Sequence, residues 1–151
     1  MHAGAVSLGY EKGMSLSIDE LTDLAVAAAQ ESRSGSYSPY TDFPMGAAVV
    51  ASDGTVCRGV LVENVSLGLA MCAERVAMFA SVTDGVEPAV LAVCSRRTDG
   101  DLTFPCGACL QVALELGGSD MTIVAVDDDG VVERALLADL LPRGPKIHSP
   151  S

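Results

Sequence analysis

Cys72, Glu74, Cys106 and Cys109 are the residues whose types and spacing in this sequence indicate chemistry. Cys106 and Cys109 form a C-x-x-C pair, and residues three apart lie on the same side of a helical turn. Cys72 stands two residues before Glu74, at the expected start of another helix. Three thiolates leave one of the four positions around a zinc ion open, as in catalytic zinc sites. We therefore predict one zinc ion held by the three cysteines.

Glu74 is the predicted proton carrier of this site. A carboxylate that lies beside a zinc ion without binding it can take a proton from an activated water and pass it to a leaving group. Three thiolates make the site negative, and Arg75 is the candidate cation that offsets this charge. The two histidines, His2 and His148, lie near the ends of the chain. A nucleophilic site that uses histidine as its base is therefore not expected.

The same residues admit other interpretations. A closed structural zinc site would need Cys57 or Cys94 as a fourth ligand, yet both lie in strand-like segments and resemble small buried hydrophobic residues. A C-x-x-C pair can also be a redox pair, although no thioredoxin-like sequence surrounds this one. Glu74 alone could serve only to favour the positive end of a helix.

Hydrophobic periodicity predicts the elements that position these residues. Ser17 and Glu20 form a capping-box pattern at the start of the first helix. Short apolar runs bounded by turn residues such as Ser52-Asp53-Gly54 predict strands. The expected helices cover residues 17–31, 71–81, 109–116 and 135–140, and the expected strands cover 45–51, 55–62, 89–95, 121–126 and 131–134. This order predicts an α/β fold, a three-layer α/β/α sandwich around one mixed five-stranded sheet.

Composition limits the classes of function and partner. The chain has 151 residues, of which 49% are apolar, and its formal net charge is −11. This acidity argues against long nucleic acids as partners, and no apolar run approaches the ~20 residues that cross a membrane. Five cysteines without an extracellular pattern predict a cytoplasmic protein. We expect a flexible segment at 1–15, one domain at 16–142 and a tail at 143–151.

Several collinear segments resemble the small homotetrameric cytidine deaminases. They are C-A-E-R at 72–75, P-C-G-A-C at 105–109 followed by Gln111, Y-S-P-Y at 37–40, F-P-M-G-A-A at 43–48 and V-E-N at 62–64. The resemblance extends over about residues 17–142. It implies one zinc ion per subunit, a homotetramer or a smaller dimer, and hydrolytic deamination of cytidine or 2′-deoxycytidine to uridine or 2′-deoxyuridine plus ammonia.

The resemblance also implies residue roles. Phe43 is expected to pack against the pyrimidine ring and Glu63 to accept a hydrogen bond from a sugar hydroxyl. The backbone around Ala73 and Cys106 is expected to read the edge of the base, and Gln111 is expected to support the site.

The departures from the family pattern fall on the substrate side. Leu61 replaces the usual Asn in the substrate-binding segment, Leu67 an aromatic residue and Leu110 an Arg, and Pro145 stands where a Phe is usual. This pattern keeps two alternatives open: deamination of a modified nucleoside (a blasticidin S-like antibiotic) or another amino-heterocycle, and a non-catalytic zinc- or ligand-binding protein. The Arg96-Arg97 pair is interpreted as a solvated loop pair.

Overall fold

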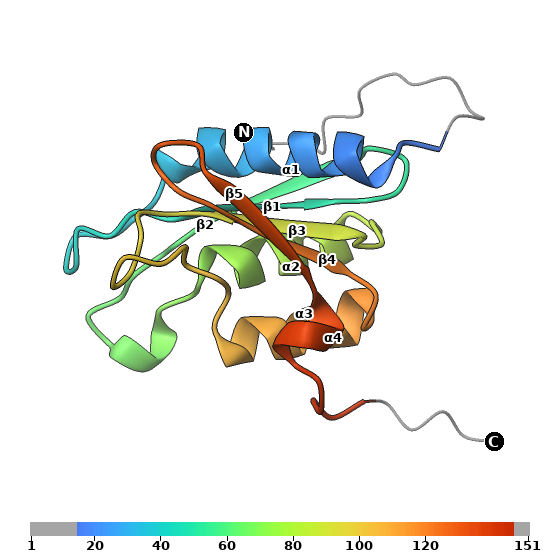
Figure 1. The fold of residues 1–151 in the computed structure, drawn as a ribbon. Helices are drawn as coiled ribbons and strands as arrows, with labels where there is room; N and C mark the ends of the chain where they lie inside the picture. Colours follow the sequence, from blue (N-terminus) through green and yellow to red (C-terminus); the bar gives the residue numbers. More distant parts are fainter. Residues whose placement is uncertain (1–14, 147–151) are drawn as a thin grey trace.

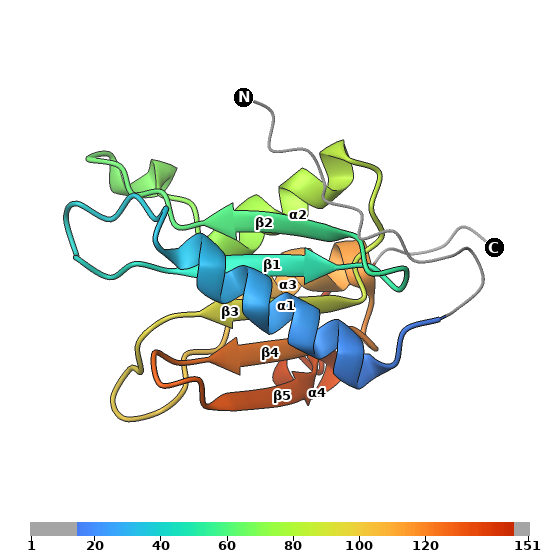
Figure 2. The same ribbon diagram turned by 90° about the horizontal axis from the view of Figure 1, so that it is seen from above.

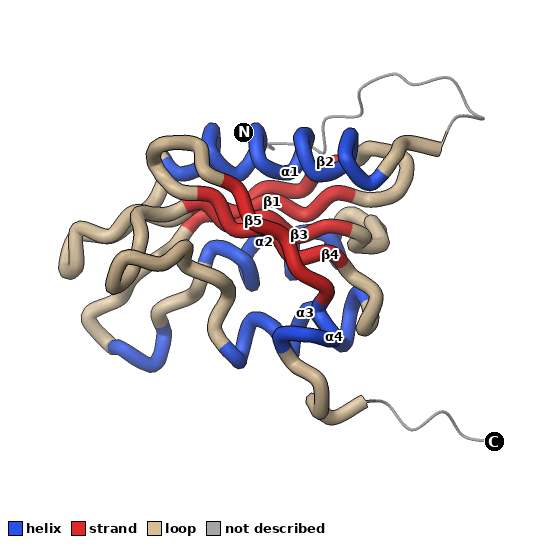
Figure 3. Tube along the Cα trace, in the orientation of Figure 1, coloured by secondary structure: helices blue, strands red, loops and turns tan. Residues whose placement is uncertain are grey.

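The computed structural model describes residues 15–146. Nearly all of the predicted N-terminal segment, the end of the tail, and both histidines lie outside this range. Figures 1 and 3 show the arrangement of the elements. The helices are α1 (Ile18–Arg33), α2 (Ala73–Thr83), α3 (Gly107–Gly117), α4 (Leu137–Leu140) and the short 3-10 helix η1 (Leu67–Leu69); the strands are β1 (Gly46–Val50), β2 (Val56–Val60), β3 (Val90–Cys94), β4 (Thr122–Val126) and β5 (Val132–Leu136).

The five strands form one mixed sheet in the order β2-β1-β3-β4-β5. The β3–β4 pair is parallel, and the other three pairs are antiparallel. Helix α1 crosses one face of the sheet, while α2, α3 and α4 lie on the other (Figures 1 and 2). The predicted α/β/α sandwich around a mixed five-stranded sheet is confirmed.

Alternating side chains of the strands build two separate cores, as the period of two in a strand requires. Ala48 and Val50 of β1 belong to the core under α1. Ala47 and Val49 belong to the core shared with α2, α3 and α4. A Cβ added to Gly59 of β2 would lie 2.3 Å from the Ala73 carbonyl oxygen, so glycine is what allows the first turn of α2 to approach the sheet.

Every predicted helix and strand is present, with ends that lie within two residues of the predicted ones. The capping box of α1 is present, with Ser17 accepting from the Glu20 amide and Glu20 from the Ser17 amide. Strand β5 continues through Leu136, so only the second part of the predicted last helix is helical. Helix η1 was not predicted, because Leu67, Gly68 and Leu69 carry no helical periodicity and none of them is buried.

Among residues 15–146, no helix is both long and apolar enough to cross a membrane.

Candidate active site

The loops that carry the predicted site residues meet at one end of the strands, which we call the active-site edge of the sheet. Gly46 at the start of β1 pairs with Val60 at the end of β2 and with Cys94 at the end of β3. The residues just beyond these positions therefore meet at this edge. They include Phe43 before β1, Leu61 and Glu63 after β2, and Arg96 after β3; we call these four residues the strand-end rim. Val62 pairs with Met71, the neighbour of Cys72, which joins the rim to the start of α2.

The three predicted ligands meet at the N-termini of two helices. Cys72 is the N-cap of α2, and Cys106 is the N-cap of α3 with Cys109 in its first turn. Neither N-cap side chain bonds to its helix amides, so both sulfurs are left to other partners. The three Sγ atoms lie within 4.8 Å of one another, with Cys106 and Cys109 3.5 Å apart. Three unpaired thiols at this spacing fit a zinc ion, which prefers sulfur ligands.

Arg75 carries the positive charge beside this cysteine cluster. Its Nη2 lies 3.4 Å from the Cys72 Sγ. The Cys109 thiol, followed by Arg75, lowers the pKa of Cys72 to about 5. Sharing a proton with Cys72, together with burial, holds the pKa of Cys109 above its usual range. Cys72 therefore ionises before Cys109, and Arg75 stabilises its charge.

Glu74 is buried, with only 2% of its side chain exposed. Its Oε2 has no hydrogen-bond partner among the described residues, although buried carboxylate oxygens are normally paired. Burial is the main cause that raises the pKa of Glu74 to about 7, and the negative Cys72 adds to it. A carboxyl with a free oxygen and a pKa near neutrality can both accept and donate a proton.

The remaining two cysteines do not join the cluster. Cys94 belongs to the core on the α1 face of the sheet, which is the opposite face. Cys57 is buried in β2, and its Sγ lies 3.8 Å from Asp84 at the C-terminal end of α2. Within residues 15–146, the group with metal-ligand spacing contains only Cys72, Cys106 and Cys109. A closed four-cysteine zinc site is thereby excluded.

Comparisons with known proteins agree with this geometry. A sequence model described as the cytidine and deoxycytidylate deaminase zinc-binding region matches residues 17–125. Cytidine deaminase from Sporosarcina psychrophila is 38% identical over 117 residues, which are 78% of this chain and 85% of that protein. Cytidine deaminase from Mycobacterium tuberculosis is 41% identical over 114 residues, covering 76% of this chain and 81% of that protein. The crystal structure of cytidine deaminase from Burkholderia pseudomallei superimposes with a TM-score of 0.75 at 37% identity, covering 85% of this chain and 99% of that one.

The chain belongs to the cytidine deaminase family. It is accordingly a zinc-dependent hydrolytic deaminase, and the cysteine cluster is compatible with its zinc ion. The family relationship favours an enzyme over the non-catalytic alternative.

Two residues of the strand-end rim have contacts within the chain in addition to the roles that the family resemblance implies for them. Glu63 is buried and already bonded within the chain. Its Oε2 accepts from the backbone amides of Tyr40 (2.8 Å) and Thr41 (3.3 Å), and its Oε1 accepts from the Thr41 hydroxyl. The Thr41 hydroxyl is the first cause that lowers the pKa of Glu63. In this structure Glu63 therefore fixes the loop that leads to Phe43.

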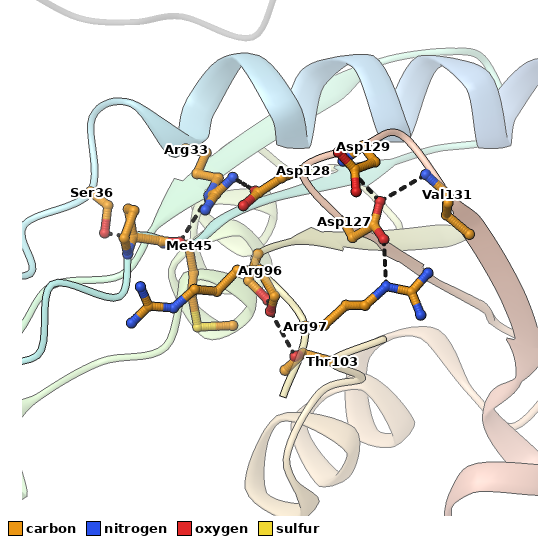
Figure 4. Close-up of polar contacts among 12 residues, drawn as sticks. Arg33, Ser36, Met45, Arg96, Arg97, Thr103, Asp127, Asp128, Asp129 and Val131 are labelled. Atoms are coloured by element: carbon orange, nitrogen blue, oxygen red, sulfur yellow. Dashed lines mark hydrogen bonds and ion pairs between the residues drawn. The ribbon is translucent and has the colours of Figure 1, made fainter. Parts of the chain in front are cut away.

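Phe43 also has a partner within the chain. The guanidinium carbon of Arg96 lies 4.6 Å from the centroid of the Phe43 ring. Arg97, the other member of the pair, points away from Arg96 and binds Asp127 at 2.7 Å (Figure 4). Both arginines are exposed, yet each has a specific partner that a solvated loop pair would not require.

The remaining departures fall in different surroundings. Leu61 continues the alternation of β2 beyond Cys57 and Gly59, which places it on the face of the sheet that carries α2. Leu110 is buried in the core of that face, whereas Leu67 is 84% exposed in η1. Gln111 donates to the Pro145 carbonyl at 2.9 Å, so it holds the start of the tail against α3.

Sequence reasoning missed two residues of this site, Thr41 and Arg96. Thr41 and Glu63 are 22 residues apart in sequence, and Arg96 and Phe43 are farther apart still. No short sequence motif therefore contains both members of either pair. The available signal was the position of Arg96 just after a predicted strand, at the same edge as Phe43.

Proposed function

We propose that this protein deaminates a cytidine-type nucleoside, with cytidine and 2′-deoxycytidine as the leading substrates. The observation that carries the proposal is the buried Glu74, which has a free carboxylate oxygen beside the cysteine cluster. The relatives named cytidine deaminase support the choice of base. Cys72, Cys106 and Cys109 would hold the zinc, which supplies Lewis-acid activation of water when bound.

Glu74 is the proposed proton carrier. Because its pKa is about 7, it can take a proton as water attacks the carbon that bears the amine. It then gives a proton to the departing ammonia. Burial keeps bulk water from competing for that proton, and Arg75 offsets the negative charge of Cys72.

The strand-end rim and the helix N-termini would bind the nucleoside. The first amides of α2 and α3, beginning near Ala73 and Cys106, have no acceptor within their helices and can read the edge of the base. Phe43 offers its ring to the pyrimidine. A carboxylate has about four acceptor sites, and three chain donors reach Glu63, so Oε1 can still accept from a sugar hydroxyl. Gln111 would support α3 from its second turn.

A second candidate is a modified nucleoside or another amino-heterocycle, and Leu61 favours it. An apolar side chain on the rim provides no hydrogen bond to a hydroxyl group. A substrate with a different or missing sugar substituent would lose nothing at this position.

Self-association into a homotetramer, or a dimer, is part of the proposal. Apolar side chains are exposed around η1 and on the outer face of α2: Val65, Leu67, Leu69, Phe79 and Val82. Large exposed apolar patches commonly mark protein interfaces. Light scattering after size exclusion tests this point, since a monomer would contradict it. We also propose residues 16–142 as the domain, and the cytoplasm, where five free thiols persist, as its location.

The test of function is a substrate panel on zinc-loaded protein. Cytidine, 2′-deoxycytidine, 2′-deoxycytidylate, a cytosine-containing nucleoside antibiotic and free cytosine are followed by ultraviolet absorbance and ammonia release. We expect the two nucleosides to react, and the Glu74→Gln variant to keep its zinc and lose turnover. Rapid turnover of the antibiotic with none of cytidine would select the second candidate. Release of no ammonia from any of them would refute the proposed function.

A further inference from the structure

Arg96 is presented by a backbone that is fixed in place. The Arg96 carbonyl accepts from the Ser95 hydroxyl (3.0 Å) and from the Thr103 hydroxyl (3.1 Å). Thr98 and Asp101 close the turn between them with two backbone hydrogen bonds of 3.0 Å. The loop after β3 is therefore fixed from Ser95 to Thr103, while the Arg96 side chain is exposed at the active-site edge.

Two carboxylates that follow β4, Asp127 and Asp128, are already used by other arginines. Arg97 binds Asp127, which is buried, and Arg33 at the end of α1 binds Asp128 (Figure 4). Among residues 15–146, no carboxylate lies within ion-pair distance of Arg96. Its contact with the Phe43 ring is therefore made by an uncommitted guanidinium group.

We propose that Arg96 is a substrate-binding residue that stacks on the planar ring of the substrate, opposite Phe43. This inference rests on the proposed function, in which the pyrimidine packs on Phe43. Stacked planes lie about 3.5 Å apart, so a ring held between Phe43 and a guanidinium needs about 7 Å between them. The present 4.6 Å leaves no room for that ring. Arg96 thus covers Phe43 in the free protein and moves outward to cover the base.

The chemistry of the site favours a neutral ring over an anionic group as the partner of Arg96. Guanidinium is planar and stacks well on aromatic surfaces. Anionic ligands usually meet several cations, whereas Arg97 and Arg33 are paired here. The three thiols, Glu74 and a net charge of −11 also oppose an approaching anion.

Four variants separate stacking from charge: Arg96→Ala, Arg96→Lys, Arg96→Phe and, as a control, Arg58→Ala. Arg58 is an exposed arginine of β2 whose partner is Glu31, on α1 across the sheet from the site. Two quantities are measured for each: the KM and kcat for 2′-deoxycytidine, and the Kd for 2′-deoxyuridine by calorimetry. We expect R96A to raise KM and Kd about five- to tenfold with little change in kcat. R96K should resemble R96A, R96F should restore most of the affinity, and R58A should match the wild type.

Two results would overturn the inference. One is an R96A variant with the wild-type KM and Kd. The other is an R96K variant that keeps full affinity while R96F does not, together with preferred turnover of 2′-deoxycytidylate, because charge would then explain the role of Arg96. A wild-type protein that deaminates none of these compounds refutes the proposed function instead, so the two failures are distinguishable.

Discussion

The cysteine cluster with Glu74 and the strand-end rim lie at the same edge of the sheet but are built in different ways. The cluster stands on the first turns of two helices, where spacings of two and three residues fix the side chains. Its unusual features are those of an enzyme: a buried carboxylate oxygen that finds no partner within residues 15–146, and a Cys72 thiol with a lowered pKa. The rim is assembled from loops, and Glu63 and Phe43 already have partners within the chain. We therefore expect that reaction chemistry and substrate choice can change separately in this protein.

The largest expected effect comes from removing one cysteine of the cluster and, as a control, one buried cysteine outside it. Cys109→Ala takes away a buried ligand, whereas Cys57→Ala takes away a buried cysteine outside the cluster. We expect C109A to lose more than the roughly hundredfold in zinc affinity that loss of a supporting residue costs, and C57A to keep one zinc per chain. Metal analysis after dialysis against a weak chelator measures both. Equal zinc retention in the two variants would show that the cysteine cluster does not bind the zinc ion.

The second prediction concerns the pH dependence of stability in zinc-free protein. The pKa of Glu74 is near 4.5 in the unfolded chain and about 7 in the fold, so only the folded state holds this proton between those values. The free energy of unfolding must then fall as pH rises through that range, by about 3 kcal/mol. Glu74→Gln lacks this contribution.

Urea unfolding of both proteins at pH 5 and pH 8 checks this difference. Relative to the wild type, E74Q should gain about 2.5 kcal/mol of stability between the two pH values. The shift of Cys72 has the opposite sign, since a lowered thiol pKa adds stability as pH rises, but both proteins carry it. Parallel pH profiles of stability would show that burial does not raise the pKa of Glu74.

The two regions also differ in how far the sequence predicts them. The capping box at Ser17 and Glu20 and the C-x-x-C pair are local patterns, and the structure contains both. The single sheet with helices on both faces (Figure 1) follows from short apolar strands that must be buried on both sides. The contacts of Glu63 with Thr41 and of Arg96 with Phe43 join residues far apart in sequence, and hydrophobic periodicity carries no information on such polar pairs. The end of β5 was misplaced because Ala135 and Leu136 suit either a strand or a helix.

The third prediction tests whether the loop before β1 depends on Glu63. Thr41→Val removes the hydroxyl that donates to Glu63 and accepts from the Phe43 amide. The pKa of Glu63 should rise, because that hydroxyl is the first cause of its lowering. We expect KM for 2′-deoxycytidine to increase about tenfold, as for loss of a hydrogen bond to a charged group. Thr41→Ser keeps the hydroxyl and is the matched control; an equal loss in both variants would point to packing instead.

The smallest predicted effect tests whether the rim alone sets substrate preference. Leu61 lies on the α2 face of the sheet, so Leu61→Asn would offer an amide to the sugar that the rim is proposed to bind, without touching the cysteine cluster. A new hydrogen bond to a hydroxyl should raise kcat/KM for cytidine about fivefold. Leu61→Met should leave kcat/KM for cytidine unchanged. With a dideoxynucleoside as substrate, L61N should also have the wild-type kcat/KM, because that substrate lacks the hydroxyl. If L61N instead altered turnover of every substrate by the same factor, Leu61 would act on the chemistry of Glu74, and the separation between the two regions would fail.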